Sequence, residues 1–217
     1  MIDIVELGIV AAALQVAGYL VYGSRVLRRD IKPNGASWFM FSYGTALLLI
    51  LEWDRDASFA LLALPAACAV SSVFVAWYCL RQSRRAWWPE HSIEKFSFAF
   101  DVLLTITYAS TWILLTKGVI DESGRDLATI LILACWNVGI FTSFFPLLRQ
   151  VYYHPSQERA IPWIIWTCAY GVLGIVTVLE QGGFDELFLY PMINVFTHGF
   201  IAARIGFWHL SRAQPVI

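Results

Sequence analysis

The chain has 217 residues, of which 59% are hydrophobic and only 14% are charged, and its mean hydropathy is +0.63. A soluble domain carries about 45–50% apolar and about 25% charged residues, so this composition excludes a water-soluble globule and a disordered chain. The 15 basic and 16 acidic residues nearly cancel, and no basic face with interleaved aromatic residues indicates nucleic-acid binding.

Long apolar segments follow one another along the chain. A helix that spans a bilayer needs roughly 20 mostly apolar residues, and we predict such helices over residues 3–23, 36–52, 58–80, 97–116, 127–148, 162–179 and 187–208. The segments do not alternate between apolar and polar residues, as the strands of a membrane β-barrel do. The first segment lacks the positively charged start of a cleavable signal peptide. The sequence therefore predicts an all-α integral membrane protein with seven transmembrane helices.

Basic residues gather on one side of the predicted helices. The loops after the first, third and fifth helices and the C-terminal end carry Arg25, Arg28, Arg29, Lys32, Arg81, Arg84, Arg85, Lys95, Arg149, Arg159, Arg204 and Arg212. The opposite loops carry only Arg55, Lys117 and Arg125. Cytoplasmic loops are enriched in Lys and Arg, so we expect the N-terminus outside and the C-terminus in the cytoplasm.

Several residues recur with a nearly constant offset, which predicts an internal repeat. Trp163 follows Trp38 by 125 positions, and the pairs Tyr43 and Tyr170, Glu52 and Glu180, and Pro65 and Pro191 recur at offsets of 127, 128 and 126. We expect a first three-helix repeat over 1–81, a cytoplasmic loop and linker helix over 82–121, and a second three-helix repeat over 122–217. Parallel repeats of this kind occur in transporters, whose substrate site lies at the repeat interface near the midplane. Glu52 and Glu180 are expected to be solvated charges at the outer helix ends.

Each half also contains a basic loop followed by a helix that begins with Ser or Pro and then Trp. The segments are Arg28-Arg29-Asp30-Ile31-Lys32-Pro33-Asn34-Gly35-Ala36-Ser37-Trp38 and Phe145-Pro146-Leu147-Leu148-Arg149-Gln150 through Ile161-Pro162-Trp163. This plan resembles the PQ-loop class, which includes the SWEET sugar transporters and the KDEL receptors, and the Trp-rich nicotinamide riboside transporters share it. The Pro-Gln pair of the class is replaced by Pro146-Leu147 and Val21-Tyr22. The resemblance implies two parallel three-helix repeats joined by a linker helix (3+1+3). It also implies association of the chain into a homo-oligomer.

Polar residues inside a bilayer are costly and are therefore candidates for function. Pro191, Asn194 and His198 share one face of the seventh predicted helix, and Pro65, Cys68 and Ser72 take the equivalent positions in the third. The resemblance to SWEET transporters implies that Asn194 contacts substrate. His198 either titrates and couples transport to protons or locks two helices through a hydrogen bond.

Other candidates come from the first, fourth and fifth predicted helices. Gln15 and Tyr19 share one face, and Trp136 and Asn137 lie on the fifth helix, so we expect all four to line a cavity between helices one, three, five and seven. Asp101 starts a polar stripe that includes Tyr108, and it either binds a proton or a cationic substrate or caps a helix start. Prolines interrupt helix hydrogen bonding, so Pro146, Pro65 and Pro191 are candidate hinges. Trp38, Trp163 and Trp166 are expected to form an aromatic belt at the cytoplasmic membrane boundary.

These features predict a transporter of a small polar or aromatic solute that works by alternating access. Two other functions stay open, namely a seven-helix receptor or sensor without transport and a membrane enzyme or lipid-handling protein in which Asp101 and His198 form an acid–base pair. The common catalytic motifs are absent from the sequence, so we do not expect an enzyme. We expect no cofactor and no metal, because the four cysteines lack metal-ligand spacing. The expected partners are the lipid bilayer and a small-molecule substrate.

Overall fold

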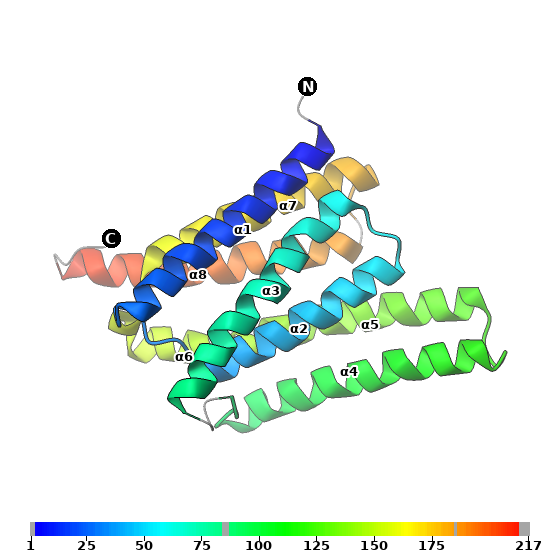
Figure 1. Ribbon diagram of the computed structural model, residues 1–217, viewed down its shortest axis with the longest axis horizontal. Helices are drawn as coiled ribbons and strands as arrows, with labels where there is room; N and C mark the ends of the chain where they lie inside the picture. Colours follow the sequence, from blue (N-terminus) through cyan, green and yellow to red (C-terminus); the bar gives the residue numbers. More distant parts are fainter. Residues whose placement is uncertain (1–2, 84–86, 185, 213–217) are drawn as a thin grey trace.

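The computed structural model describes residues 3–83, 87–184 and 186–212, and every regular element in these residues is a helix (Figure 1). The helices are α1 (Ile4–Leu27), α2 (Gly35–Asp54), α3 (Phe59–Gln82), α4 (Ser92–Thr116), α5 (Glu122–Ser143), α6 (Phe145–Tyr153), α7 (Ala160–Gln181) and α8 (Leu189–Ser211), with short 3-10 turns η1 (Pro155–Gln157) and η2 (Glu186–Phe188). Arg84 and Arg85, two of the basic residues on the predicted cytoplasmic side, lie outside the described residues.

Local sequence explains where several helices begin. The side chains of Asn34, Ser58 and Asp121 accept hydrogen bonds from backbone N–H groups three residues later, at 3.1, 3.4 and 2.8 Å. Such caps satisfy donors that have no partner inside the helix. α7 ends at Gly182, which has a φ of +70° that glycine adopts without strain.

Six helical segments of the described chain are long and apolar enough to cross a membrane, namely α1, α2, α3, α4, α5 together with α6, and α7. The prediction of an all-helical protein with several helices long and apolar enough to span a membrane is therefore confirmed for the described residues. The seventh predicted span, 187–208, is helical as α8, but α8 is not among the six. Its inward face carries Asn194 and His198, and these two residues together with Arg204 lower its average hydropathy.

The fifth predicted span is broken after Ser143. Pro146 lacks the N–H that would continue the helical ladder. In addition, the Ser37 hydroxyl from α2 donates to the Ser143 carbonyl at 3.0 Å and accepts from the Leu147 N–H at 3.1 Å. These two backbone groups would bond each other directly in an unbroken helix. The inserted hydroxyl and Pro146 together separate α5 from α6.

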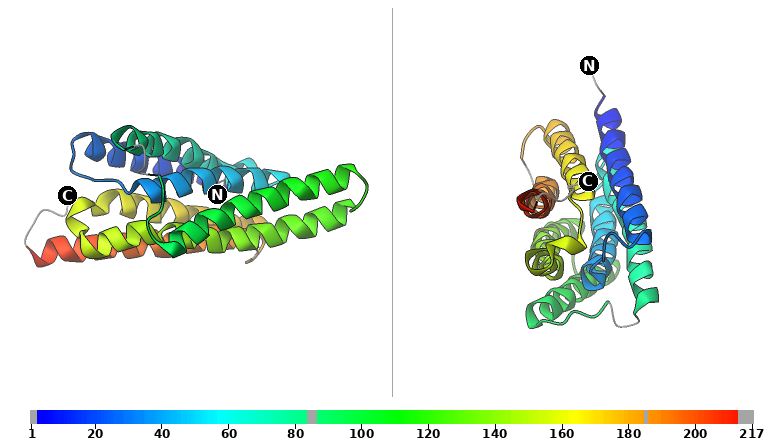
Figure 2. Two further views of the ribbon diagram at one scale, coloured as in Figure 1. Left: turned by 90° about the horizontal axis from the view of Figure 1, so that it is seen from below. Right: turned by 90° about the vertical axis from the view of Figure 1, so that its left-hand side faces the viewer.

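Six helices form a closed ring in the order α1, α3, α2, α5, α8 and α7, with α7 packed back against α1. Figure 1 shows these helices side by side, and the right-hand view of Figure 2 looks along α8 and shows α1 lengthwise. α4 lies outside the ring against α5. The buried core fills the ring between its two halves, so the ring encloses the residues described next.

Candidate binding site in the centre of the bundle

A small cavity of about 20 Å³ lies inside the ring. A site needs about 10–15 Å³ to hold one water molecule, so the cavity has room for little more than a single water. The bundle is therefore closed around its centre. The lining residues are Gln15, Tyr19, Trp38, Phe41, Thr45, Cys68, Ile140, Phe144, Trp163, Trp166, Tyr170, Asn194 and His198.

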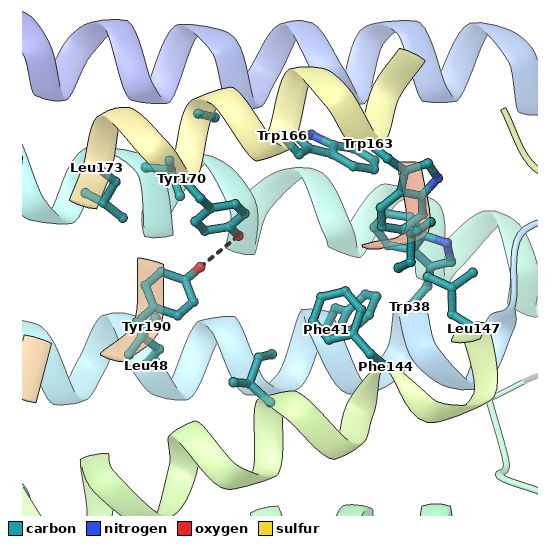
Figure 3. Packing of buried hydrophobic residues seen from close by; sticks show 14 of the residues in the cluster. Trp38, Phe41, Leu48, Phe144, Leu147, Trp163, Trp166, Tyr170, Leu173 and Tyr190 are labelled. Carbon is teal, nitrogen blue, oxygen red and sulfur yellow. Dashed lines mark hydrogen bonds between the residues drawn. The ribbon is translucent and has the colours of Figure 1, made fainter. Parts of the chain in front are cut away.

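Aromatic rings make most of the cavity wall. The ring centroids of Trp163 and Trp166 are 5.0 Å apart, those of Trp38 and Trp166 are 5.9 Å apart, and those of Phe41 and Phe144 are 4.5 Å apart. Figure 3 shows Trp166 and Tyr170 on the opposite side of the bundle centre from Phe41 and Phe144. Centroid separations of 4.5–7 Å are those that aromatic pairs prefer, so the rings support one another around the cavity.

The expected aromatic belt is wrong for Trp38, Trp163 and Trp166. All three side chains are buried, and their indole N–H groups have partners inside the protein instead of at the lipid headgroups. The Trp38 indole donates to the Tyr22 hydroxyl at 3.0 Å, and the Trp166 indole donates to the Gln15 carbonyl at 3.1 Å. These internal bonds explain why the tryptophans turn inward.

Asn194 and His198 reach the cavity from α8, as their shared face predicted. The Asn194 amide donates to the Tyr190 carbonyl at 2.9 Å, and Nδ1 of His198 lies 2.8 Å from the Asn194 carbonyl oxygen. A carbonyl only accepts, so Nδ1 carries a hydrogen, and Nε2 is an acceptor whenever the ring is neutral. The imidazole is surrounded by the rings of Phe144, Trp163, Trp166 and Tyr170 at centroid distances of 5.0–5.9 Å.

The remaining polar groups of the cavity are uncharged. Oε1 of the buried Gln15 has no hydrogen-bond partner. The Cys68 sulfur lies 3.2 Å from the Tyr19 hydroxyl and 3.7 Å from the Tyr170 hydroxyl. A buried acceptor without a donor is costly, so Gln15 needs a donor from a water or a ligand.

Separate layers of side chains close the cavity at its two ends. At the end of the bundle that we name the Tyr190 end, the hydroxyls of Tyr170 and Tyr190 are 3.0 Å apart, as the dashed line in Figure 3 shows. At the opposite end, which we name the Glu158 end, Trp38 and Trp163 are held by a hydrogen-bonded group that includes Tyr22 and Glu158. Sequence reasoning missed Glu158, although it is an isolated acidic residue in a basic loop.

Five of the sequence-predicted binding residues line the cavity, namely Gln15, Tyr19, Cys68, Asn194 and His198. Ser72, Trp136 and Asn137 do not. Ser72 donates to the Ala69 carbonyl at 3.2 Å, Asn137 donates to the Leu133 carbonyl at 2.9 Å, and Trp136 packs on Tyr190 at a centroid distance of 5.7 Å.

The lining also differs from the expected set of helices. α2 and α7, the second and sixth helices of the sequence prediction, contribute Trp38, Phe41, Thr45, Trp163, Trp166 and Tyr170. They reach the centre because the two halves of the ring meet through α1 against α7 and through α2 against α5.

The candidate hinges take different positions. Pro65 is inside α3, and Pro146 follows the break between α5 and α6. Pro191 is the third residue of α8. A proline in the first helical turn removes no internal hydrogen bond, so Pro191 cannot loosen α8 in the way expected of a hinge.

Asp101 and Tyr108 lie away from the cavity. α4 begins at Ser92, so Asp101 is well inside a helix and the alternative that it caps a helix start is wrong. Its buried Oδ1 has no hydrogen-bond partner, and a Cβ atom at Gly139 of α5 would overlap it. Tyr108 is half-buried farther along α4. The two residues follow the seam between α4 and the ring.

One of the two glutamates expected to be solvated at the outer helix ends differs from expectation. Glu52 is buried, and its Oε2 has no hydrogen-bond partner, so the expectation of a solvated charge is wrong there. Glu180 accepts a hydrogen bond from the Ser58 hydroxyl at 2.7 Å.

The described residues contain no group of three or more His, Cys, Asp and Glu side chains placed to hold a metal ion. Comparisons with protein-family models, with curated proteins and with solved structures find no match for this chain.

Proposed function

We propose that the protein is a membrane transporter of a small polar or aromatic solute, which it moves by alternating access to a site between two three-helix halves. The observation that carries this proposal is the central cavity, which receives side chains from both halves and is closed at each end by a separate layer. A transporter needs a midplane site at the interface of its repeats. Two independent layers allow one end to open while the other stays closed.

The order of helices in the ring supports the 3+1+3 arrangement. The first half contributes α1, α3 and α2, and the second half contributes α5, α8 and α7 in the corresponding order. α4 stays outside the ring, as a linker between two repeats would. This order also supports the resemblance to the PQ-loop class, with repeats over 1–81 and 122–217.

The chemistry of the cavity favours a solute with a flat face and hydrogen-bond donors. Rings of Trp, Tyr and Phe stack on flat groups. Gln15 Oε1 and, in the neutral imidazole, His198 Nε2 can accept hydrogen bonds, and no Asp, Glu, Lys or Arg side chain of the described residues lines the cavity. An anionic solute would therefore have no cation to pair with at this site.

The alternative of a receptor or sensor would use the same cavity without moving its ligand across. The cavity holds little more than one water in the closed bundle, so any ligand has to enter through one of the two closing layers. An enzymatic alternative is less well supported, because Asp101 lies on the α4 seam and does not face His198.

A ligand screen tests the proposal. Full-length protein purified in detergent is heated with sugars, amino acids, nucleosides and vitamins, and a ligand that binds the folded state raises the melting temperature. We expect at least one class to do so and Asn194→Ala to abolish the shift. Flux of that compound into liposomes then separates a transporter from a receptor.

Asn137→Ala is the matched control. Both asparagines are buried, and each amide bonds the carbonyl four residues earlier at 2.9 Å. Only Asn194 lines the cavity. An equal loss of binding in both variants would contradict a central site, and binding without flux would favour the receptor.

A further inference from the structure

The carboxyl group of Glu158 joins several elements at one end of the cavity. Glu158 has no exposed surface and lies between η1 and α7. Its Oε1 accepts a hydrogen bond from the Tyr22 hydroxyl of α1 at 3.1 Å, and its Oε2 accepts one from the Trp163 indole of α7 at 3.2 Å. The Tyr22 hydroxyl in turn accepts from the Trp38 indole of α2. One carboxyl group therefore links α1 and α2 of the first half to α7 of the second.

This hydrogen-bonded group directly supports the cavity wall. Trp38 and Trp163 both line the cavity, and the ring of Tyr22 packs against them at centroid distances of 4.9 and 6.2 Å. The cavity cannot open toward this end while both indoles keep their bonds. Release of the Glu158 carboxyl would free the Trp163 indole directly and would remove the acceptor that holds the Tyr22 hydroxyl, to which the Trp38 indole donates.

No side chain in the described residues forms a salt bridge with Glu158. The neighbouring Arg159 guanidinium donates to the backbone carbonyls of Ser156 and Glu158, at 3.1 and 3.2 Å, and not to the carboxyl group. The other titratable groups that face Glu158 are the hydroxyl of Tyr22 from α1, the thiol of Cys79 from α3 and the imidazole of His209 from α8. None of these supplies a fixed positive charge at the carboxyl oxygens.

Burial is the dominant influence on the ionisation of this group. It raises the pKa of Glu158 from 4.5 to about 8, against the opposing effects of the Trp163 and Tyr22 hydrogen bonds and of Arg159. The charged form is costly in a buried place with few partners. Water reaching the carboxyl group would return its pKa toward the ordinary value.

We propose that Glu158 is a proton-binding site that controls the opening of the cavity at this end, closed when the carboxyl group is protonated and released when it ionises. The inference rests on the proposed function, since a controlled end matters only if the cavity opens. The closed form binds the proton more tightly than a hydrated open form. By linkage, closure is favoured at low pH and is lost as the pH rises toward the pKa of the buried group.

Cys68 provides a reporter of opening, because its sulfur lies on the cavity. We would replace Cys79, Cys135 and Cys168 by Ala in the full chain and measure the rate at which a small cationic methanethiosulfonate modifies Cys68. Thiol reactivity itself rises with pH, so the quantity compared is the rate divided by that of the same protein carrying Glu158→Gln. Gln imitates the protonated carboxyl group and should hold the end closed at every pH.

We expect the ratio of the two modification rates to rise by up to about tenfold per pH unit between 4.5, the ordinary pKa of the glutamate, and about 8, its pKa in the closed form. Above about pH 8 the ratio should level off. Glu90→Gln, which removes an exposed carboxylate at the same end of the bundle, should leave the rise intact. A ratio that is flat with pH overturns the proposal but leaves the central site standing. A Glu158→Gln protein that fails to fold also overturns the proton-site proposal without affecting the central site, because the proposal requires this variant to be at least as stable as the parent at about pH 7.5.

Trp38→Ala separates failure of this inference from failure of the proposed function. The substitution removes one indole of the closing layer and should admit the reagent at every pH. If this variant is modified while the parent and Glu158→Gln stay unmodified throughout, the cavity does not open in the native chain. That result would overturn the proposed function together with the proton site.

Discussion

Single side chains in this bundle satisfy much of their hydrogen bonding within their own helix. Thr45, Asn137 and Thr177 each bond the carbonyl four residues earlier, at 2.6, 2.9 and 2.9 Å. Such bonds make polar residues tolerable in a bilayer without linking helices. A polar residue in a span is thus a weak indicator of function. A buried polar atom without a partner is not sufficient either, because Oε1 of Gln15 and Oδ1 of Asn137 both lack one and only Gln15 lines the cavity.

Gly18 lies directly against the indole of Trp166. A Cβ atom at this position would overlap the indole of Trp166, so Gly18→Ala forces that ring away from its bond to the Gln15 carbonyl. We expect Gly18→Ala to lower the free energy of unfolding by about 1–3 kcal/mol and to weaken ligand binding at the cavity. Thermal melting of purified protein measures the first effect.

Gly23→Ala is the control in the same helix, because no heavy atom lies within 4 Å of its added Cβ. Gly23→Ala should raise the free energy of unfolding by up to about 1 kcal/mol, because alanine loses less backbone entropy than glycine on folding. Equal destabilisation by the two variants would mean that the loss at Gly18 reflects helix backbone effects and not contact with Trp166.

Among the helices, the break between α5 and α6 is one of the features that tie one half of the bundle to the other. Its hydrogen bonds come partly from Ser37, which belongs to α2. The loop that follows α1 adds to this connection, since the Gln150 amide of α6 donates to the Lys32 carbonyl at 2.6 Å and accepts from Asn34 at 3.1 Å. α6 is therefore hydrogen-bonded to the first half at both Ser37 and the loop after α1.

Ser37→Ala should therefore act on two helices. It removes both the donor to Ser143 and the acceptor for Leu147, and either these backbone groups stay unpaired or α5 and α6 straighten to join them. We expect a loss of at least about 1 kcal/mol in the free energy of unfolding. Hydrogen exchange of the Leu147 amide should also become faster if the group stays unpaired.

Ser143→Ala is a suitable comparison, because its buried hydroxyl bonds only the Gly139 carbonyl of its own helix at 3.0 Å. This substitution should change stability by less than about 0.5 kcal/mol. If Ser143→Ala costs as much as Ser37→Ala, the link between α2 and the break has no special weight.

Considered as a whole, the molecule was partly predictable from its sequence. Hydropathy located the helices because each must hide its backbone from lipid over a fixed thickness. The inward turn of Trp38 was not predictable, since a tryptophan near a helix start gives the same signal at a membrane interface. Its network depends on Glu158, which lies 136 positions from Tyr22. Asn137 and Asn194 likewise look equivalent in sequence, and only packing places Asn194 alone on the cavity.

The number of times that the whole chain crosses the membrane depends on whether α8 spans it. α8 falls short on average apolarity, yet its outward side chains include Phe196, Phe200 and Phe207, which are 70, 59 and 72% exposed. Its polar residues Asn194 and His198 face the cavity. Lipid would therefore meet an apolar surface, and the ring would be open without α8. We expect α8 to span, which puts the two ends of the chain on opposite sides.

Reporters attached at each end of the chain measure this directly. A C-terminal fluorescent protein should be bright in the cytoplasm, and a short tag at the N-terminus should bind antibody on intact cells, as the distribution of basic residues predicts. Six crossings would place both ends on one side. That outcome would remove α8 from the membrane, and with it Asn194 and His198 from any midplane site, so the topology test also bears on the proposed transport mechanism.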